Sequence, residues 1–169
     1  MEQKIKRTKS AEQALVSLMN LCARAEKCSG DALRLMNGWG VARGDAERVL
    51  QRLVAERFID DSRYAASFVR EKINLSGWGE YKIIAALRRK GIEHSVISAA
   101  LSENGSVDMT ERLLELLRRK IRVTKYKNSA DLRAKLLRYA AGQGYPFSTA
   151  RTAVESLVKC DEECDNFDF

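Results

Sequence analysis

The chain has 169 residues, of which 45% are hydrophobic and 31% are charged, so it can build a core and a charged surface. It contains one proline and ten glycines and lacks long runs of β-branched residues, which favours an all-α fold. No apolar run approaches the length of a membrane span or of a signal peptide, so we expect a cytoplasmic protein. A formal net charge of +7 favours a polyanionic partner, although charge also serves solubility.

The sequence divides into five parts. Residues 1–10 form a basic arm that we expect to be flexible. Residues 11–58, 59–104 and 105–159 are three similar stretches, and each has the pattern of three helices. Residues 160–169 form an acidic tail, which we also expect to be flexible.

The similarity of the three stretches is clearest around one predicted helix-turn-helix junction. In each stretch an amphipathic helix runs into a glycine, and an apolar residue follows ten positions later; the pairs are Gly40 and Leu50, Gly91 and Leu101, and Gly144 and Val154. Glycine suits the end of a helix because it tolerates the left-handed backbone conformation there. A period near fifty residues predicts tandem repeats whose units stack, because short units cannot bury their apolar faces alone.

Helical spacing also predicts core positions. Apolar residues recur three or four positions apart, which places them on one face of a helix. The expected core residues are Ala65, Phe68, Val69, Ile73, Ile83, Ile84, Leu87, Leu113, Leu114, Leu117 and Ile121.

The residues that commonly carry catalysis or bind metals form no convincing constellation. The single histidine, His94, has no evident nucleophile or orienting partner, and we expect it to be an exposed turn residue. The cysteines stand at positions 22, 28, 160 and 164, with five and three intervening residues within the two pairs, which does not favour a zinc site. We expect Cys22 to lie in the core and the chain to bind no metal.

Two further motifs have structural interpretations. Gly77, Trp78 and Gly79 are not followed by the lysine and hydroxyl residue of a phosphate loop, so we interpret them as a turn between helices. Asp60 and Asp61 precede a predicted helix, where carboxylates cap free amides. We therefore expect neither an enzyme nor a cofactor.

The basic residues are more informative. Residues 110–139 contain ten lysines and arginines against three acids. The helix dipole and pairs with Glu111 and Glu115 explain part of this excess, but it continues through Lys125 and Lys127, past the predicted helix end. Such a strip suits contacts with phosphates. The predicted partner- or DNA-binding residues are Arg63, Arg70, Lys82, Arg88, Arg89, Lys90, Arg118, Arg119, Lys120, Arg122, Lys125 and Lys127.

Two segments resemble the RecX family of bacterial RecA modulators. The segment RFIDDSRYAASFVREK carries the likeness through Phe58, Ile59, Asp60, Asp61, Tyr64, Ala65, Phe68, Val69 and Arg70. The segment GWGEYKIIAALRRKGI carries it through Gly79, Lys82, Ile83, Leu87, Lys90, Gly91 and Ile92. One departure is Arg57, which stands where the family usually has glycine and must end its helix without glycine's backbone freedom.

The resemblance implies three tandem three-helix repeats in an elongated, curved array. It also implies that the protein binds the RecA–DNA filament and inhibits RecA in strand exchange, ATP hydrolysis and SOS signalling, without catalytic residues. We expect a monomer that contacts single- or double-stranded DNA directly or through the filament. Two alternatives stay open: a general nucleic-acid-binding helical protein without a recombinase partner, and an adaptor for acidic proteins that binds no DNA.

Overall fold

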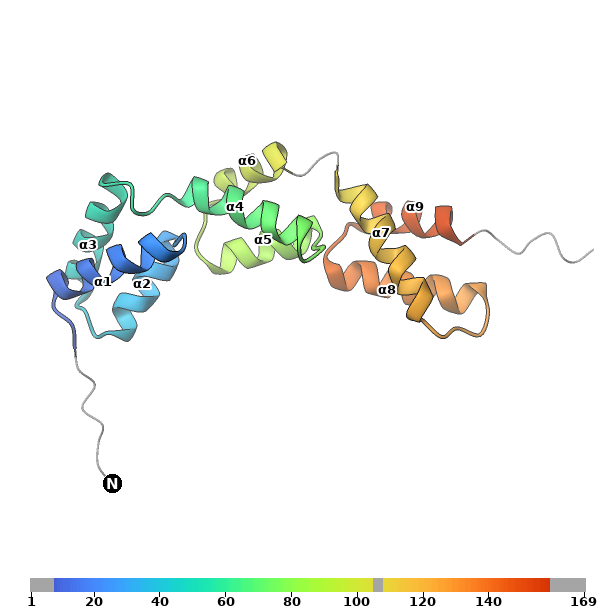
Figure 1. The fold of residues 1–169 in the computed structure, drawn as a ribbon, viewed down its shortest axis with the longest axis horizontal. Helices are drawn as coiled ribbons and strands as arrows, with labels where there is room; N and C mark the ends of the chain where they lie inside the picture. Colours follow the sequence, from blue (N-terminus) through green and yellow to red (C-terminus); the bar gives the residue numbers. More distant parts are fainter. Residues whose placement is uncertain (1–7, 105–107, 159–169) are drawn as a thin grey trace, which may run out of the picture. The chain divides into compact units, whose positions relative to one another are not determined.

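The computed structural model describes residues 8–104 and 108–158, and these residues form nine α-helices and no strand (Figure 1). The helices are α1 (Ala11–Arg24), α2 (Ser29–Gly38), α3 (Arg43–Ala55), α4 (Asp61–Asn74), α5 (Glu80–Arg89), α6 (His94–Asn104), α7 (Asp108–Val123), α8 (Ser129–Gln143) and α9 (Phe147–Leu157). The all-α prediction is confirmed, and three helices lie in each of the three predicted stretches. Most of the predicted basic arm and the whole acidic tail lie outside the described residues, as do Cys160 and Cys164.

The chain divides into two compact units. Among the described residues, the first unit contains residues 8–67 and 87–100, and the second contains residues 68–86, 101–104 and 108–158. None of the helices in the described ranges is both long enough and apolar enough to cross a membrane.

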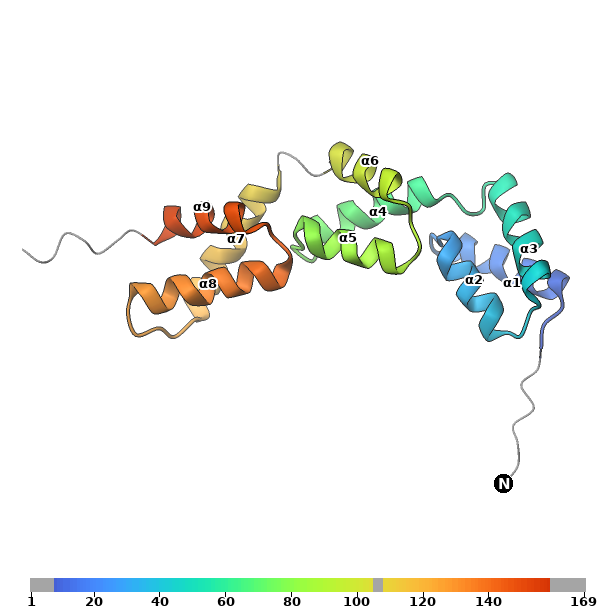
Figure 2. The ribbon, with the colours of Figure 1, turned by 180° about the vertical axis from the view of Figure 1, so that it is seen from behind.

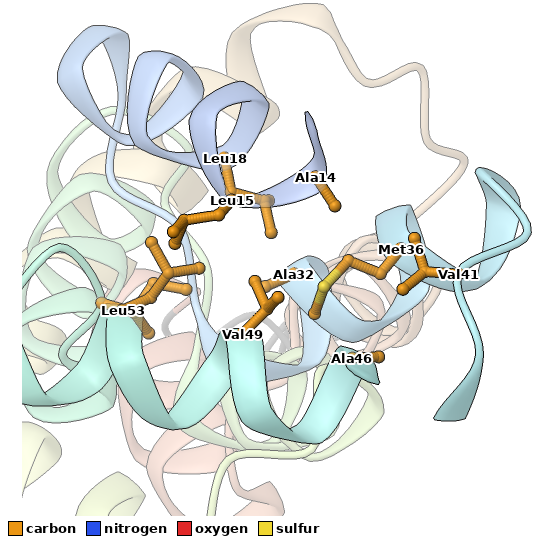
Figure 3. Close-up of a cluster of buried hydrophobic side chains, with 10 residues drawn as sticks. Ala14, Leu15, Leu18, Ala32, Met36, Val41, Ala46, Val49 and Leu53 are labelled. Atoms are coloured by element: carbon orange, nitrogen blue, oxygen red, sulfur yellow. The ribbon is translucent and has the colours of Figure 1, made fainter. Parts of the chain in front are cut away.

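The core of the first unit is built mainly by α1, α2 and α3. Helices α1 and α2 each pack against α3, and Figure 3 shows their apolar side chains pointing toward one another. Leu18, Met36 and Leu53, one from each helix, are fully buried. Burial of such a side chain stabilises the fold by roughly 1.5–3 kcal/mol. Helix α1 begins at a capping box, in which Ser10 and Gln13 each accept a hydrogen bond from the other's backbone amide.

The second unit has its own core, built by α7, α8 and α9, which pack pairwise against one another. The two views of the ribbon agree on this grouping (Figures 1 and 2). Leu113 and Leu117 of α7 and Leu136 of α8 are fully buried there. Asn128 caps the start of α8 by accepting a hydrogen bond from the Asp131 amide, and Gly144 caps its end with a φ of 88°. The predicted role of Gly144 as a left-handed helix terminator is thus confirmed.

The predicted core faces are largely confirmed. Buried positions among them are Ala65, Val69, Ile73, Ile83, Leu87, Leu113 and Leu117, whereas Phe68, Ile84, Leu114 and Ile121 are only half-buried. An apolar stripe spans about 100° of a helix, so the residues at its edges reach the protein surface.

Arg57 adopts the backbone conformation that its position demands. It follows α3 with a φ of 59°, and it is the one residue other than glycine with a positive φ in the described ranges. The amides of Phe58 and Ile59 then donate to the carbonyl of Leu53, which closes the helix end. An arginine therefore occupies a left-handed turn, at a cost of roughly 1–2 kcal/mol relative to an unstrained conformation.

The two aspartates at the start of α4 cap different helices. Asp60 Oδ1 accepts from the amides of Ser62 and Arg63, as expected for the cap of α4. Asp61 Oδ1 instead accepts from the amide of Ser29, at 2.8 Å, at the start of α2. The sequence indicated the capping chemistry of Asp61 but not its target, which lies 32 residues away.

Candidate functional site

Positive charge accumulates around the end of α7 in the second unit. Residues 116–130 contain six lysines and arginines and no acid. We call this region and the facing part of α8 the basic corner, which consists of Arg118, Arg119, Lys120, Arg122, Lys125, Lys127, Lys135 and Arg138.

Repulsion between neighbouring cations slightly destabilises the end of α7. The helix dipole favours positive charge in the last turn, where Lys120 and Arg122 lie. However, Arg118 and Arg122 are four residues apart, and like charges at this spacing destabilise a helix by a few tenths of a kcal/mol. Both side chains are exposed. An anionic partner would relieve this repulsion.

The loop between α7 and α8 is held in place from both sides. Thr124 Oγ1 donates to the carbonyl of Lys120 at 2.6 Å. Lys135 Nζ donates to the carbonyl of Lys125 at 2.8 Å and to Asp131 Oδ2 at 2.7 Å, while the Lys127 amide donates to the same carboxylate. The hydrogen bonds from Lys135 and Lys127 hold the pKa of Asp131 below its ordinary value. The loop therefore presents its cations from a defined backbone.

A shallow hollow of about 360 Å³, largely open to solvent, lies in the basic corner. Its lining residues are Lys120, Val123, Thr124, Lys125, Lys135 and Arg138. The structure thus brings together two predicted contact residues, Lys120 and Lys125, with two that we had not singled out, Lys135 and Arg138. Lys135 and Arg138 are three positions apart and therefore share a face of α8. That spacing is the feature of the sequence that could have predicted their place in the site.

Lys90 was predicted to contact a partner, but the structure places it in a contact inside the first unit. Its ammonium group donates to both carboxylate oxygens of Asp31, at 2.8 and 3.0 Å, and lies 5.4 Å from the ring centroid of Tyr64. Burial alone would raise the pKa of Asp31, but hydrogen bonds from Lys90 and Cys28 and the charge of Lys90 outweigh it and lower the pKa. Lys90 therefore ties the α5–α6 turn to α2.

The backbones of α2 and of the α5–α6 turn also approach each other closely here. We call this contact, together with the Lys90–Asp31 ion pair, the first junction. A Cβ atom on Gly30 would overlap the carbonyl oxygen of Lys90, and the Cys28 sulfur lies 4.0 Å from that oxygen. Cys28 is fully buried. Only glycine at position 30 allows this contact between α2 and the α5–α6 turn.

Lys82 is likewise drawn into an internal contact, here in the second unit. Its ammonium group lies 4.7 Å from the ring centroid of Trp78 and 3.4 Å from Gln143 Oε1. Beside it, the amides of Gly79 and Tyr81 donate to the carbonyls of Gln143 and Gly144, at 2.8 and 2.9 Å. These contacts join the α4–α5 turn to the α8–α9 turn, and we call them the second junction.

Tyr145 completes the second junction. Its hydroxyl donates to the carbonyl of Gly77 at 3.4 Å, and burial raises the pKa of Tyr145 to about 12. A Cβ atom on Gly79 would lie 2.5 Å from the carbonyl carbon of Gly144. The turn predicted for residues 77–79 is therefore confirmed, and it is also a contact surface.

The remaining predicted contact residues lie at the surface. Arg63 is exposed but forms a two-pronged ion pair with Glu26, at 2.7 and 3.1 Å. Arg70 on α4 and Arg88 and Arg89 in the last turn of α5 are exposed. Neither Arg63 nor Arg70 belongs to the basic corner.

The residues considered for catalysis or metal binding remain scattered. His94 is exposed at the start of α6. Cys22 is half-buried against the first core, while Cys28 is the fully buried cysteine, and burial raises the pKa of both thiols. Across the described ranges, no three histidine, cysteine or acidic residues gather in a way that suits a metal ion.

Two family models match most of this architecture. The model described as "RecX, second three-helix domain" matches residues 60–101, and the one described as "RecX, third three-helix domain" matches residues 107–154. The second match contains the whole basic corner.

Two relatives named "Regulatory protein RecX" illustrate the range of similarity. One, from Pseudomonas savastanoi pv. phaseolicola, is 33% identical over 128 residues, which cover 76% of this chain and 81% of the relative. The other, from Streptococcus agalactiae, is 26% identical over 122 residues, which cover 70% of this chain but 45% of the relative. The chain thus spans about half the length of the streptococcal relative it matches.

Two solved structures share the fold. The "Crystal structure of regulatory protein RecX" matches with a TM-score of 0.77 at 23% identity, over 88% of this chain and 72% of that one. The "Crystal structure of RecX from Lactobacillus salivarius" matches with a TM-score of 0.74 at 17% identity, over 87% of this chain and 96% of that one.

Proposed function

This chain belongs to the RecX family, and on that premise we propose that it binds the RecA–DNA filament and inhibits RecA. The inhibited activities are strand exchange, ATP hydrolysis and the co-protease activity of the SOS response. The protein would thereby regulate DNA repair without catalysing a reaction itself.

The basic corner is the observation that carries this proposal. Its six cations on α7 and the following loop have no acid among residues 116–130, and two more cations face them from α8. A RecA filament presents both DNA phosphates and protein surface, and the phosphates attract such a cluster through counterion release. The proposal therefore places the basic corner against the filament or its DNA.

The mechanism is steric and electrostatic. A protein that binds the assembled filament better than the free protomers, and covers the surface where the next protomer adds, blocks growth at that end. A protein that prefers a distorted filament promotes disassembly instead. Both effects need only a difference in affinity between two filament states.

Within the proposal, the predicted contact residues have different roles. Arg70, Arg88 and Arg89 are exposed and lie outside the basic corner, and we propose each of them as a separate contact residue. We assign Lys82 and Lys90 to the junctions that hold the repeats, because their ammonium groups already have internal partners. Arg63 is exposed and already forms an ion pair with Glu26, so we propose that a partner contacts it together with that pair. We further propose that residues 11–58, 59–104 and 105–159 are the three repeats and that the protein acts as a monomer.

The test is RecA's ATP hydrolysis on single-stranded DNA, with this protein added from far below to equal stoichiometry. We expect suppression well below one copy per RecA protomer, because a protein that acts at filament ends or through disassembly affects many protomers. A cognate RecA that hydrolyses ATP unchanged at every ratio would contradict the proposal. Retained DNA binding in that case would favour a general nucleic-acid-binding protein.

A further inference from the structure

We propose that the hollow in the basic corner seats a backbone phosphate of single-stranded nucleic acid, and that Tyr126 stacks on a neighbouring unpaired base. This inference deepens the proposed function, on which its biological role rests, by naming the strand type and the chemical groups contacted. Three features of the basic corner carry it.

The first feature is the charge that lines the hollow. Lys120, Lys125, Lys135 and Arg138 contribute four cations, and no acid is among the lining residues. Lys135 donates to Asp131 and to the Lys125 carbonyl, and these two contacts account for two of its three ammonium protons. Lys120 lies with its ammonium group 5.3 Å from the ring centroid of Tyr139. The lining thus combines Lys120 and Lys135, whose ammonium groups have internal contacts, with the exposed side chains of Lys125 and Arg138. Arg138 also donates through Nε to the carbonyl of Ala134. A cluster of four cations suits a compact anion such as a phosphate.

The second feature is the apolar surface that the basic corner exposes. Tyr126 follows Lys125 and precedes Lys127 in the loop, and it is 51% exposed. Val123, on the wall of the hollow, is 75% exposed. Exposed rings among cations are the pattern with which proteins bind single strands, since the cations follow the backbone and the ring stacks on a base.

The third feature is the fixed loop, which distinguishes a single strand from a duplex. Lys135 donates to the Lys125 carbonyl before Tyr126, and the Lys127 amide donates to Asp131 after it, so the backbone is held on both sides of the ring. The bases of a duplex are already stacked on one another and offer no face to such a ring. We therefore favour a single strand as the ligand, and we treat duplex DNA and an acidic protein surface as the competing outcomes.

The experiment measures direct binding of the full chain to a fluorescein-labelled mixed-sequence single strand and to the matching duplex, without RecA, over a series of salt concentrations. Tyr126→Ala should weaken binding to the single strand roughly tenfold and leave duplex binding unchanged, because stacking is lost. Tyr126→Phe should retain the affinity because it keeps the ring. Tyr81→Ala, at a 59% exposed tyrosine on α5, is the matched aromatic control and should have no effect.

The phosphate seat is tested by Lys125→Gln and Arg138→Gln. Each should lower the slope of log affinity against log salt concentration by about one, the signature of a lost phosphate contact. Arg24→Gln, which removes an exposed charge on α1 in the other unit, should leave the slope unchanged. Circular dichroism melting of each variant verifies that the fold persists.

Several outcomes would overturn the inference. Equal losses on single strand and duplex, or no loss on either, for Tyr126→Ala would rule out base stacking. Unchanged salt slopes for both charge variants would rule out the phosphate seat and point to an acidic protein as the ligand of the basic corner. If the binding losses are absent but the wild type suppresses RecA's ATP hydrolysis, the inference fails while the proposed function stands. If the wild type does not suppress ATP hydrolysis but the strand-selective loss is seen, the inference stands while the proposed function fails.

Discussion

The two junctions join helices that are distant in the sequence by different chemistry. At the first junction, α2 contacts the α5–α6 turn, and an ion pair between Lys90 and Asp31 joins the two elements. At the second, the α4–α5 turn meets the α8–α9 turn through two backbone hydrogen bonds and the Tyr145 hydroxyl. Both depend on a glycine that lets two backbones approach, Gly30 in one and Gly79 in the other.

This difference shows which part of a junction is replaceable. The close backbone approach is common to both, so the missing side chain of glycine is the shared requirement. The polar contact differs, and an ion pair in one junction takes the place of neutral hydrogen bonds in the other. We therefore expect glycine substitutions to damage both junctions alike, and changes of pH to affect them differently.

The largest effect is expected from the substitutions Gly30→Ala and Gly79→Ala. Each added methyl group would collide with backbone atoms, which cannot move aside as a side chain can. We expect each variant to lose about 3 kcal/mol of unfolding free energy and roughly 6–12 °C in Tm. Urea denaturation and thermal melting measure the loss, and hydrogen exchange assigns it to one unit.

The matched control is Gly44→Ala. Gly44 lies in α3, and a Cβ atom there would meet nothing within 4 Å. Because alanine favours a helix over glycine, this variant should be unchanged or more stable by up to about 1 kcal/mol. Losses of similar size in all three variants would contradict the idea that the backbone approach is the shared requirement.

The second prediction concerns pH. The lowered pKa of Asp31 means that its contribution is present above the ordinary carboxyl value of 3.8 and is lost as the pH falls through its lower pKa in the folded protein. Acid should therefore weaken the first junction, and Asp31→Asn should remove that dependence at a cost of about 1–2 kcal/mol at neutral pH.

Alkaline conditions probe the second junction. The pKa of Tyr145 is raised to about 12 from an ordinary value of 10, so the stability linked to its neutral hydroxyl declines as the pH rises from 10 to 12. Tyr145→Phe should remove the part of this decline that belongs to Tyr145. Asp31→Asn should leave that part in place and reduce the part linked to Lys90, whose pKa burial would lower but hydrogen bonds to Asp31 and Tyr64 raise. The readout is the unfolding free energy against pH for the wild type and both variants. Parallel curves for all three proteins would refute the assignment of different chemistry to the two junctions.

The smallest effect is expected at Arg57, beyond the end of α3. Its φ of 59° is costly for arginine and costs glycine little. Arg57→Gly should relieve this strain and stabilise the folded protein by about 1 kcal/mol. The greater conformational entropy that glycine gives the unfolded chain offsets part of this gain. The midpoint of urea unfolding measures the change, and hydrogen exchange should place it in the first unit. A lower midpoint would show that the arginine side chain contributes more than its backbone costs.

Local patterns in the sequence predicted most of the fold. Helical spacing identified buried residues such as Val69, Ile83 and Leu117, and the glycine after α8 identified a left-handed helix end. The junctions were not predicted, because they join residues about 60 positions apart, such as Asp31 and Lys90. Composition and spacing describe one helix at a time and contain no information on which turn meets which.

The candidate site was predicted in part for the same reason. The charge excess marked Arg118 to Lys127 correctly as an accumulation of cations, because it is continuous in the sequence. Lys135 and Arg138 were missed because they join the hollow only when α8 folds back along α7. Lys82 was included because it shares a helical face with Arg89, and Lys90 because it continues that cluster, whereas the ammonium groups of both have internal partners.

The central claim, that the basic corner binds the RecA filament, is tested most directly by cosedimentation with RecA filaments on single-stranded DNA. The decisive variant carries Arg118→Gln, Arg119→Gln and Arg122→Gln, and its control carries Arg24→Gln, Arg43→Gln and Arg48→Gln in the first unit, so both lose three exposed charges. We expect the wild type and the control to sediment with the filament and the basic-corner variant to stay largely in the supernatant. Equal sedimentation of all three proteins would contradict the claim.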